Sequence, residues 1–200
     1  MTNSAMTDRA TPKLILTGFM ATGKSVIGPL VAHRLGWPFA DIDAAVAARA
    51  GKPVAAIFAD DGEARMRALE REAIAAVARD RRRCAQCGRR RPAVIATGGG
   101  AIVDEANFAE LHAAGVVICL SARPDVIARR VGRSAARRPK LVEGGKPLLE
   151  RINELMAERA RAYARADATI DTSDLAIDTV VERVIDAYVA HGKLRCNPSA

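Results

Sequence analysis

The sequence predicts an α/β fold in which helices pack on both faces of a buried parallel sheet. The chain has 200 residues, of which 50% are hydrophobic, and this is enough for one compact domain with a substantial core. Aromatic residues make up only 4%, so the core must consist mainly of aliphatic side chains, which suit helices packed on a parallel sheet. Short apolar runs also alternate with amphipathic segments, which is the pattern of parallel strands joined by right-handed helical crossovers.

Five short apolar runs are the candidate strands, and helical periodicity fills the segments between them. The first run is continuously apolar and ends at Gly18, which predicts a buried strand followed by a turn. The candidate strands are 13–17, 39–42, 93–96, 116–120 and 168–170. The candidate helices are 24–35, 44–50, a segment starting near 53, 63–80, 104–113, 124–131, 148–163 and 175–189. Gly36 and Gly51 are expected to end helices, and Pro53 to lie in the first turn of one.

Residues 13–190 are predicted to form a single domain, with a disordered leader over 1–12 and a flexible tail over 191–200. The leader is polar and lacks the apolar core of a signal peptide, and no run approaches the ~18 apolar residues that span a bilayer. Four cysteines in a chain of this length do not make a secreted disulfide framework, and reduced thiols fit better. We therefore expect a soluble, cytoplasmic monomer without a membrane partner.

A basic segment at about 81–91 interrupts an otherwise nearly balanced charge. Seven arginines and one aspartate between 79 and 91 contribute +6 to a formal net charge of +8. Such a segment can bind nucleic acid or another anionic surface, but this one has no interleaved aromatic residues. A solvated loop is the favoured interpretation, and nucleic acid is not expected as a partner. Cys84 and Cys87 within it have no second pair of ligands, so no zinc site is expected.

A glycine-rich motif follows the first candidate strand. Residues 18–25 read Gly-Phe-Met-Ala-Thr-Gly-Lys-Ser, which matches G-x-x-x-x-G-K-[ST] in full and lies between a strand and a helix, as the motif requires. In such a loop, backbone N–H groups and the helix dipole surround a phosphate, while Lys24 places its charge on the β- and γ-phosphates and Ser25 binds Mg²⁺. The sequence therefore predicts a site for a nucleotide and Mg²⁺. The residues expected to contact the nucleotide from this loop are Ala21, Thr22, Gly23, Lys24, Ser25 and Val26.

A second metal-associated carboxylate is absent from the position where many proteins with this loop have one. The apolar run 93–96 leads into Thr97 and a triple glycine instead of an aspartate. Asp41 and Asp43 flank a single residue at the end of the second candidate strand, so one carboxylate can face a metal ion and the other a substrate. An exposed acidic pair at the end of a strand is the alternative.

Three arginines are candidate ligands for an anion. Arg67 lies on the long amphipathic helix, Arg138 in a basic irregular stretch, and Arg159 near the end of a later helix. Taken singly, each is better explained as a solvated surface residue. Arginine is nonetheless the side chain best suited to clamp a carboxylate or a transferring phosphoryl group, because its planar guanidinium binds two oxygens at once.

Taken together, these motifs resemble the shikimate kinase family, from residue 14 to about 188. Their order and spacing are far more specific than the phosphate-binding loop alone. The resemblance is carried by that loop, Phe39-Ala-Asp-Ile-Asp43, Ile57-Phe58 followed by Gly62-Glu63, Arg67 before Glu70, and the glycines 98–100. It implies a P-loop NTPase-type three-layer fold with a five-stranded parallel sheet and flanking helices. It also implies ATP and Mg²⁺ as cofactors, and transfer of the γ-phosphate to a hydroxyl of shikimate.

The resemblance implies roles at the acceptor side of the site. Asp43 would hydrogen-bond the hydroxyls of shikimate, and Arg67 and Arg159 would bind its carboxylate. Gly99 would let the backbone approach the ring. These four residues are the expected substrate-binding set.

At the nucleotide side, the resemblance places Asp41 near Mg²⁺ and the reacting hydroxyl. Arg138 would belong to a lid at about 133–147 that closes on the ATP phosphates, and Arg130 would lie near the adenine. Lys24, Asp41 and Arg138 are the expected catalytic residues, because phosphoryl transfer needs positioning and neutralisation of charge more than covalent help.

The chain departs from the family pattern in three places. Met66 replaces an aromatic residue before the first carboxylate-binding arginine, and the basic segment looks inserted. The lid sequence Arg-Pro-Leu-Leu of the family is divided here between 138–141 and 146–149. Two other functions stay open, namely a kinase of another small hydroxy acid such as gluconate and a non-catalytic ATP-binding module that contacts nucleic acid. The two arginines with Asp43 favour shikimate.

Overall fold

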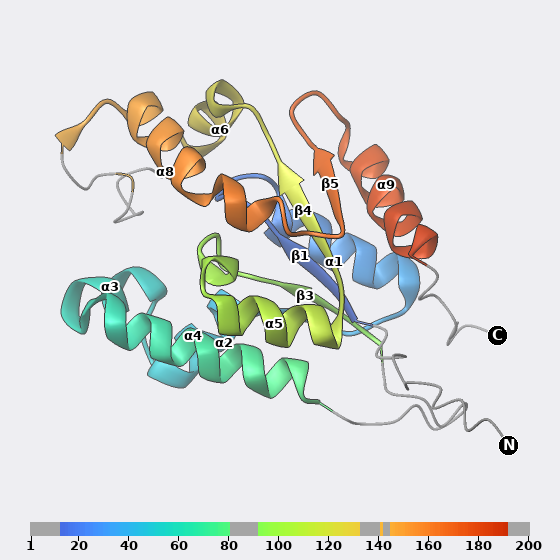
Figure 1. Cartoon of the computed structure of the whole chain (residues 1–200), viewed down its shortest axis with the longest axis horizontal. Coiled ribbons are helices and arrows are strands. Elements are labelled where there is room, and N and C mark those ends of the chain that lie inside the picture. Colours follow the sequence, from blue (N-terminus) through green and yellow to red (C-terminus); the bar gives the residue numbers. More distant parts are fainter. Residues whose placement is uncertain (1–12, 81–91, 133–140, 142–144, 192–200) are drawn as a thin grey trace, which may run out of the picture.

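A computed structural model describes residues 13–80, 92–132, 141 and 145–191 (Figure 1). The expected leader, the basic segment 81–91, most of the expected lid and all but the first residue of the expected tail lie outside this part of the chain. Within it, no helix is long and apolar enough to cross a membrane.

The described residues form a five-stranded sheet in the order β2-β3-β1-β4-β5. All four pairs of neighbouring strands are parallel, which confirms the predicted α/β class and the parallel sheet. Every residue of the central strand β1 is buried, because helices cover both faces of the sheet. The strands are β1 (Lys13–Thr17), β2 (Phe39–Asp41), β3 (Ala93–Ala96), β4 (Gly115–Ser121) and β5 (Ala168–Asp171).

Helices form the two outer layers. Helices α1 and α9 lie on one face of the sheet, α4 and α5 lie on the other with α2 and α3, and α6 and α8 pack together beyond the sheet (Figure 1). The helices are α1 (Lys24–Leu35), α2 (Ile42–Ala50), α3 (Val54–Asp60), α4 (Gly62–Ala78), the 3₁₀ turn η1 (Ala101–Val103), α5 (Glu105–Ala114), α6 (Pro124–Val131), α8 (Leu148–Tyr163) and α9 (Ile177–Ala190).

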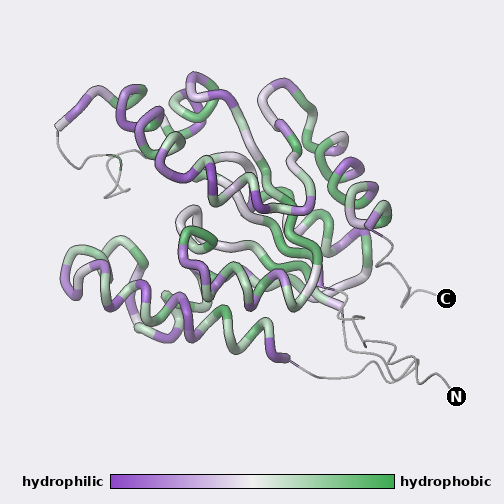
Figure 2. The backbone as a smooth tube through the Cα atoms, in the orientation of Figure 1, coloured by the Kyte–Doolittle hydropathy of each residue, from purple (hydrophilic) through white to green (hydrophobic). Residues whose placement is uncertain are grey.

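Alternation along the strands divides the core into two halves. Leu14 and Leu16 pack with apolar side chains of α1 and α9, whereas Ile15 between them packs with those of α2, α3, α4 and α5. A third cluster joins Phe19, which follows β1, to α6 and α8. The strands at the centre are accordingly the most hydrophobic segments, and hydrophilic residues gather on the outer helices (Figure 2).

Two predicted element boundaries, one at the end of β2 and one at the start of α3, were wrong. Ile42 was expected to end the strand, but it begins α2, because the Asp41 carboxylate caps that helix by accepting the Ala44 N–H at 3.2 Å. Pro53 was expected in the first turn of a helix, but it lies just before α3. Gly36 and Gly51 do end α1 and α2 with φ of 64° and 70°, as expected.

A buried lysine joins β1 to the end of α4, and it carries a stability prediction. Lys13 is 1% exposed, and its Nζ donates to the carbonyl oxygens of Val77 and Ala78, the latter at 2.8 Å, where the helix has no donors of its own. Lys13→Met is expected to lower the free energy of unfolding by about 1–3 kcal/mol, because buried carbonyls lose their donor. Thermal or urea unfolding measures this change.

Lys52→Met is the matched control, because the partners of Lys52 in its ion pairs among the described residues are two exposed aspartates. This variant is expected to leave the unfolding midpoint almost unchanged. Equal destabilisation of the two variants would contradict the role given to Lys13.

Candidate active site

The phosphate-binding loop leaves the carboxyl end of β1, the central strand, and leads directly into α1. Gly18 has φ of 127°, and a Cβ there would lie 2.0 Å from the carbonyl oxygen of Leu120 in β4, so only glycine fits. Ala21 has φ of 59°, the left-handed region, which costs a residue with a side chain about 1–2 kcal/mol. Strained backbone conformations of this kind are common at functional sites, where the surrounding structure stabilises them.

Lys24, the first residue of α1, turns back into this loop. Its Nζ donates to the carbonyl oxygens of Gly18 at 2.7 Å and Phe19 at 2.8 Å, and the residue is almost fully buried. The ammonium is therefore held inside the curve of the loop, beside the N-terminus of α1, whose dipole also favours an anion. The arrangement is suited to a phosphate group.

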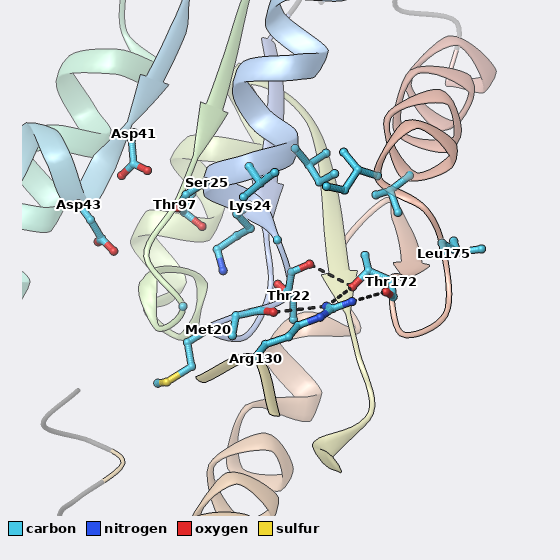
Figure 3. A pocket seen from close by; sticks show the side chains of 17 residues that line it. Met20, Thr22, Lys24, Ser25, Asp41, Asp43, Thr97, Arg130, Thr172 and Leu175 are labelled. Atoms are coloured by element: carbon cyan, nitrogen blue, oxygen red, sulfur yellow. Dashed lines mark hydrogen bonds between the residues drawn. The ribbon is translucent and has the colours of Figure 1, made fainter. Parts of the chain in front are cut away.

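One cavity of about 470 Å³ contains this loop and the ends of several other elements (Figure 3). Asp41 and Asp43 lie at one end, Lys24 near the middle, and Arg130, Thr172 and Leu175 at the other end. The structure thus brings together most of the residues that the sequence selected. Those that line the cavity are Ala21, Thr22, Gly23, Lys24, Ser25, Val26, Asp41, Asp43, Gly99 and Arg130.

The end of the cavity around Arg130 combines a guanidinium group with apolar surface. Arg130 donates from Nη1 to the Thr172 hydroxyl at 2.9 Å and from Nη2 to the Thr172 carbonyl. The buried Thr172 hydroxyl also lies 3.1 Å from the carbonyl oxygen of Thr22, which ties this end to the phosphate-binding loop. Val26 and Ile177 border the cavity with 51% and 52% of their surface exposed. A flat aromatic base could pack on this apolar surface beside Arg130.

Ser25 and Asp41 can supply two of the oxygen ligands that Mg²⁺ requires. Both line the cavity and offer oxygen ligands, and one Asp41 oxygen remains beyond the one that caps α2. In the described part of the chain, no group of three His, Cys, Asp or Glu side chains could hold a metal ion. A magnesium ion here would therefore need phosphate oxygens as well, which is its usual arrangement in phosphoryl-transfer enzymes.

The glycines 98–100 form a turn on which the acceptor-side residues rest. A Cβ at Gly98 would lie 2.7 Å from Asp43 Oδ1 and 2.8 Å from Glu70 Oε1, and one at Gly100 would lie 2.8 Å from Arg67 Nη2. These side chains therefore pack directly against the backbone of the turn, so any larger residue would displace a charged group.

Arg67 and Arg159 line a second cavity of about 360 Å³, which Asp43 and Gly99 do not line. The glycine turn lies between the two cavities, since Gly99 lines the first and Gly100 the second. The four residues expected to bind one substrate thus lie on both sides of this turn.

The surface interpretation of the two arginines does not hold. Arg159 is 9% exposed, with its guanidinium carbon 5.6 Å from the centre of the Phe19 ring. Arg67 has a side chain 25% exposed, packs at 5.9 Å over the Phe58 ring and donates to Glu70 Oε2 at 2.7 Å. Aromatic faces and a buried carboxylate hold both guanidinium groups in place.

Glu70 is a buried acid beneath Arg67, and its titration carries a prediction. Burial raises the pKa of the Glu70 carboxyl above 4.5, the Arg67 guanidinium opposes this rise, and the Asp43 charge adds to it. The folded chain therefore binds this proton more tightly than the unfolded chain, so stability should fall as pH rises from about 4.5 through the folded pKa. Glu70→Gln should remove that fall. Unfolding midpoints of the two chains across this pH range are the measurement, and parallel profiles would contradict the prediction.

Most of the expected lid, namely residues 133–140 and 142–144, lies outside the described residues. Arg138 is one of these residues. Leu141 is described, and it is buried in the cluster of α6 and α8. The role of Arg138 therefore stays a prediction from the sequence.

The family can be decided by comparison with known proteins. The family model for shikimate kinase matches residues 20–189, which include residues 20–25 of the phosphate-binding loop, both aspartates and both arginines. The chain belongs to the shikimate kinase family. The shikimate kinase of Thermoanaerobacter pseudethanolicus is 40% identical over 176 residues, which cover 88% of this chain and 95% of that one. The shikimate kinase of Geobacter metallireducens is 41% identical over 171 residues, covering 86% and 88%.

Solved structures agree with membership of the shikimate kinase family. Shikimate kinase from Acinetobacter baumannii in complex with shikimate has a TM-score of 0.79 at 26% identity, over 92% of this chain and 96% of that one. A gluconokinase from Sinorhizobium meliloti has a TM-score of 0.54 at 18% identity, over 90% and 94%. The second likeness shows a shared fold alone. The predicted P-loop kinase fold is therefore confirmed.

Sequence analysis missed three residues of the site that the structure now includes. Glu70 was part of the family pattern but received no role, because its burial under Arg67 depends on how α4 packs. Tyr163 stands four residues after Arg159 in the sequence and gave no separate signal. Thr172 lies in no motif, and its place in the cavity and the hydrogen bonds of its hydroxyl identify it.

Proposed function

We propose that this member of the shikimate kinase family transfers the γ-phosphate of ATP to a hydroxyl of shikimate, giving shikimate 3-phosphate. The observation that carries the proposal is the glycine turn, whose residues Gly99 and Gly100 border the cavity around Lys24 and the cavity of Arg67 and Arg159, respectively. A nucleotide in the first cavity and a carboxylate in the second would place a small hydroxy acid between them.

At the nucleotide side, Lys24 would bind the β- and γ-phosphates, and Arg130 with the apolar residues beside it would receive the adenine. A magnesium ion held by Ser25, Asp41 and phosphate oxygens would neutralise charge that develops on those oxygens. Arg138, from the expected lid, would add a further positive charge. The γ-phosphoryl group then needs little beyond alignment with the attacking hydroxyl.

At the acceptor side, two carboxylates and two guanidinium groups would bind different functional groups of the substrate. Asp43 would accept hydrogen bonds from hydroxyls, and Asp41 would orient the hydroxyl that attacks the phosphorus. Arg67 and Arg159 would each bind the carboxylate with paired N–H donors. Recognition of both a carboxylate and hydroxyls would select a hydroxylated ring acid.

We also propose a reducing setting, the cytoplasm, and a monomeric state. The described cysteine, Cys119, is buried in β4 and free. Burial raises its pKa to about 11, although the Lys24 charge opposes this, so the thiol stays protonated and unreactive. A free thiol in the core supports the proposed reducing setting.

An acceptor screen tests the proposed function. The chain is incubated with ATP and Mg²⁺, and ADP release is followed with shikimate, with gluconate and with no acceptor. We expect release that depends on shikimate and background release in the other two samples. Equal release with gluconate would favour the kinase of another hydroxy acid, and no acceptor-dependent release would favour the non-catalytic module.

A further inference from the structure

Tyr163, the last residue of α8, reaches the glycine turn. Its hydroxyl donates to the carbonyl oxygen of Gly99 at 2.5 Å. The same carbonyl accepts a longer hydrogen bond, 3.3 Å, from Nη1 of Arg159. One partly buried acceptor is therefore shared between a tyrosine and the arginine that we assign to the acceptor's carboxylate.

The position of Gly99 affects both cavities. A Cβ on Gly99 would lie 3.3 Å from the Met20 amide nitrogen and 3.5 Å from the Gly18 carbonyl oxygen, so the turn packs on the backbone of the phosphate-binding loop. That Gly18 carbonyl also accepts a hydrogen bond from Lys24. Backbone packing therefore holds the turn on its nucleotide side, whereas the side-chain donors to the Gly99 carbonyl come from α8.

Tyr163 is well suited to be the donor to the Gly99 carbonyl. Burial raises the pKa of its hydroxyl to about 12, although the neighbouring Arg159 guanidinium opposes this, so the hydroxyl remains a donor at neutral pH. Its ring packs against two of the apolar clusters, the one on the face of α4 and α5 and the one between α6 and α8. The ring is therefore held in position while the hydroxyl points at the turn.

We propose that Tyr163 is a positioning residue, which satisfies the Gly99 carbonyl so that the Arg159 guanidinium can turn to the carboxylate of the acceptor. The inference rests on the proposed function, because it needs Arg159 to bind that carboxylate. Without the hydroxyl, Arg159 is the remaining side-chain donor to Gly99 among the described hydrogen bonds. A carboxylate would then compete with the Gly99 carbonyl for the same guanidinium group.

The test is the variant Tyr163→Phe, assayed with ATP and shikimate. We expect KM for shikimate to rise about tenfold, the size of effect that one buried hydrogen bond gives. The kcat and KM for ATP should stay within about twofold of the wild type, because the lost interaction acts on acceptor binding. ATP titration gives the fraction of molecules in each preparation that bind ATP. Rates are divided by this fraction, so a variant of which some molecules are unfolded can still be compared with the wild type.

Tyr188→Phe is the matched control, since it removes the same atom from a second tyrosine whose ring packs in an apolar cluster. The Tyr188 hydroxyl has no hydrogen-bond partner among the described residues, and the residue lies in the cluster of α1 and α9. This variant should keep the wild-type KM for shikimate. An equal rise in both variants, or a Tyr163→Phe variant that loses kcat and ATP affinity together, would mean a purely structural role and overturn the inference.

The two proposals fail in different ways. If the wild type phosphorylates shikimate and Tyr163→Phe has the same KM, the inference about Tyr163 is overturned and the proposed function stands. If the wild type does not phosphorylate shikimate, the proposed function falls, and the inference that rests on it falls as well.

Discussion

Lys24→Ala is expected to reduce phosphoryl transfer about a thousandfold or more, because the charge closest to the transferring phosphate is lost. The structure adds a second effect, since the Lys24 ammonium also binds the Gly18 and Phe19 carbonyl oxygens that shape the loop. Lys24→Met lacks the charge and the donors as Lys24→Ala does, but it keeps most of the side chain's volume, so comparing the two variants shows how much of the loss comes from the missing volume. Rates of ADP release with shikimate are measured for both variants.

The two Lys24 variants should remain folded, because Lys24 faces the phosphate-binding loop and lies outside the three apolar clusters. Their thermal unfolding is measured beside the rates. Turnover close to the wild-type rate in a folded Lys24→Met variant would reject the assignment of the loop to ATP.

Removing either acceptor-side arginine is expected to weaken the use of shikimate by orders of magnitude and to leave ATP affinity nearly unchanged. A paired, charge-assisted contact to a carboxylate is worth about 2–5 kcal/mol when partly buried, or roughly 30-fold to several thousand-fold in kcat/KM. Arg67→Lys and Arg159→Lys should recover only part of the loss, because an ammonium group cannot bind two oxygens in one plane. The measurements are kcat/KM for shikimate and ATP affinity by titration.

Each arginine has a matched control two residues away on its own helix. Arg65→Ala on α4 and Arg161→Ala on α8 remove exposed arginines, and both should behave as the wild type. Arg67→Ala also leaves the buried Glu70 without its ion pair, so Arg67→Ala with Glu70→Gln shows how much of the loss comes from that unpaired acid. Unchanged use of shikimate in both Arg67→Ala and Arg159→Ala would remove the basis for a carboxylate clamp.

The parts of the site that the sequence predicted are those that local residues determine. The phosphate-binding loop is contiguous, and its glycines and lysine act through positions within eight residues of one another. The strand before it and the helix after it follow from apolar periodicity alone. Asp41 and Asp43 could be found because the strand ends where they occur, although the helix cap on Asp41 shifted the predicted boundary by one residue.

The remaining parts depend on contacts between distant segments, which a single sequence does not reveal. Taken singly, Arg159 gave the same signal as any surface arginine, and the family resemblance selected it; its burial depends on the packing of α8 against Phe19. Glu70 is charged and would ordinarily be exposed, yet Arg67 and the glycine turn enclose it. The division of the acceptor residues between two cavities likewise follows from the fold of that turn.

The most direct test of the central claim is the fate of the γ-phosphate of ATP, followed by phosphorus NMR. The wild-type chain is incubated with ATP, Mg²⁺ and shikimate until the nucleotide is partly consumed. We predict a phosphate monoester of shikimate in an amount equal to the ADP formed. ADP accompanied only by inorganic phosphate, or ATP left unchanged while the chain is folded and binds it, would contradict the account.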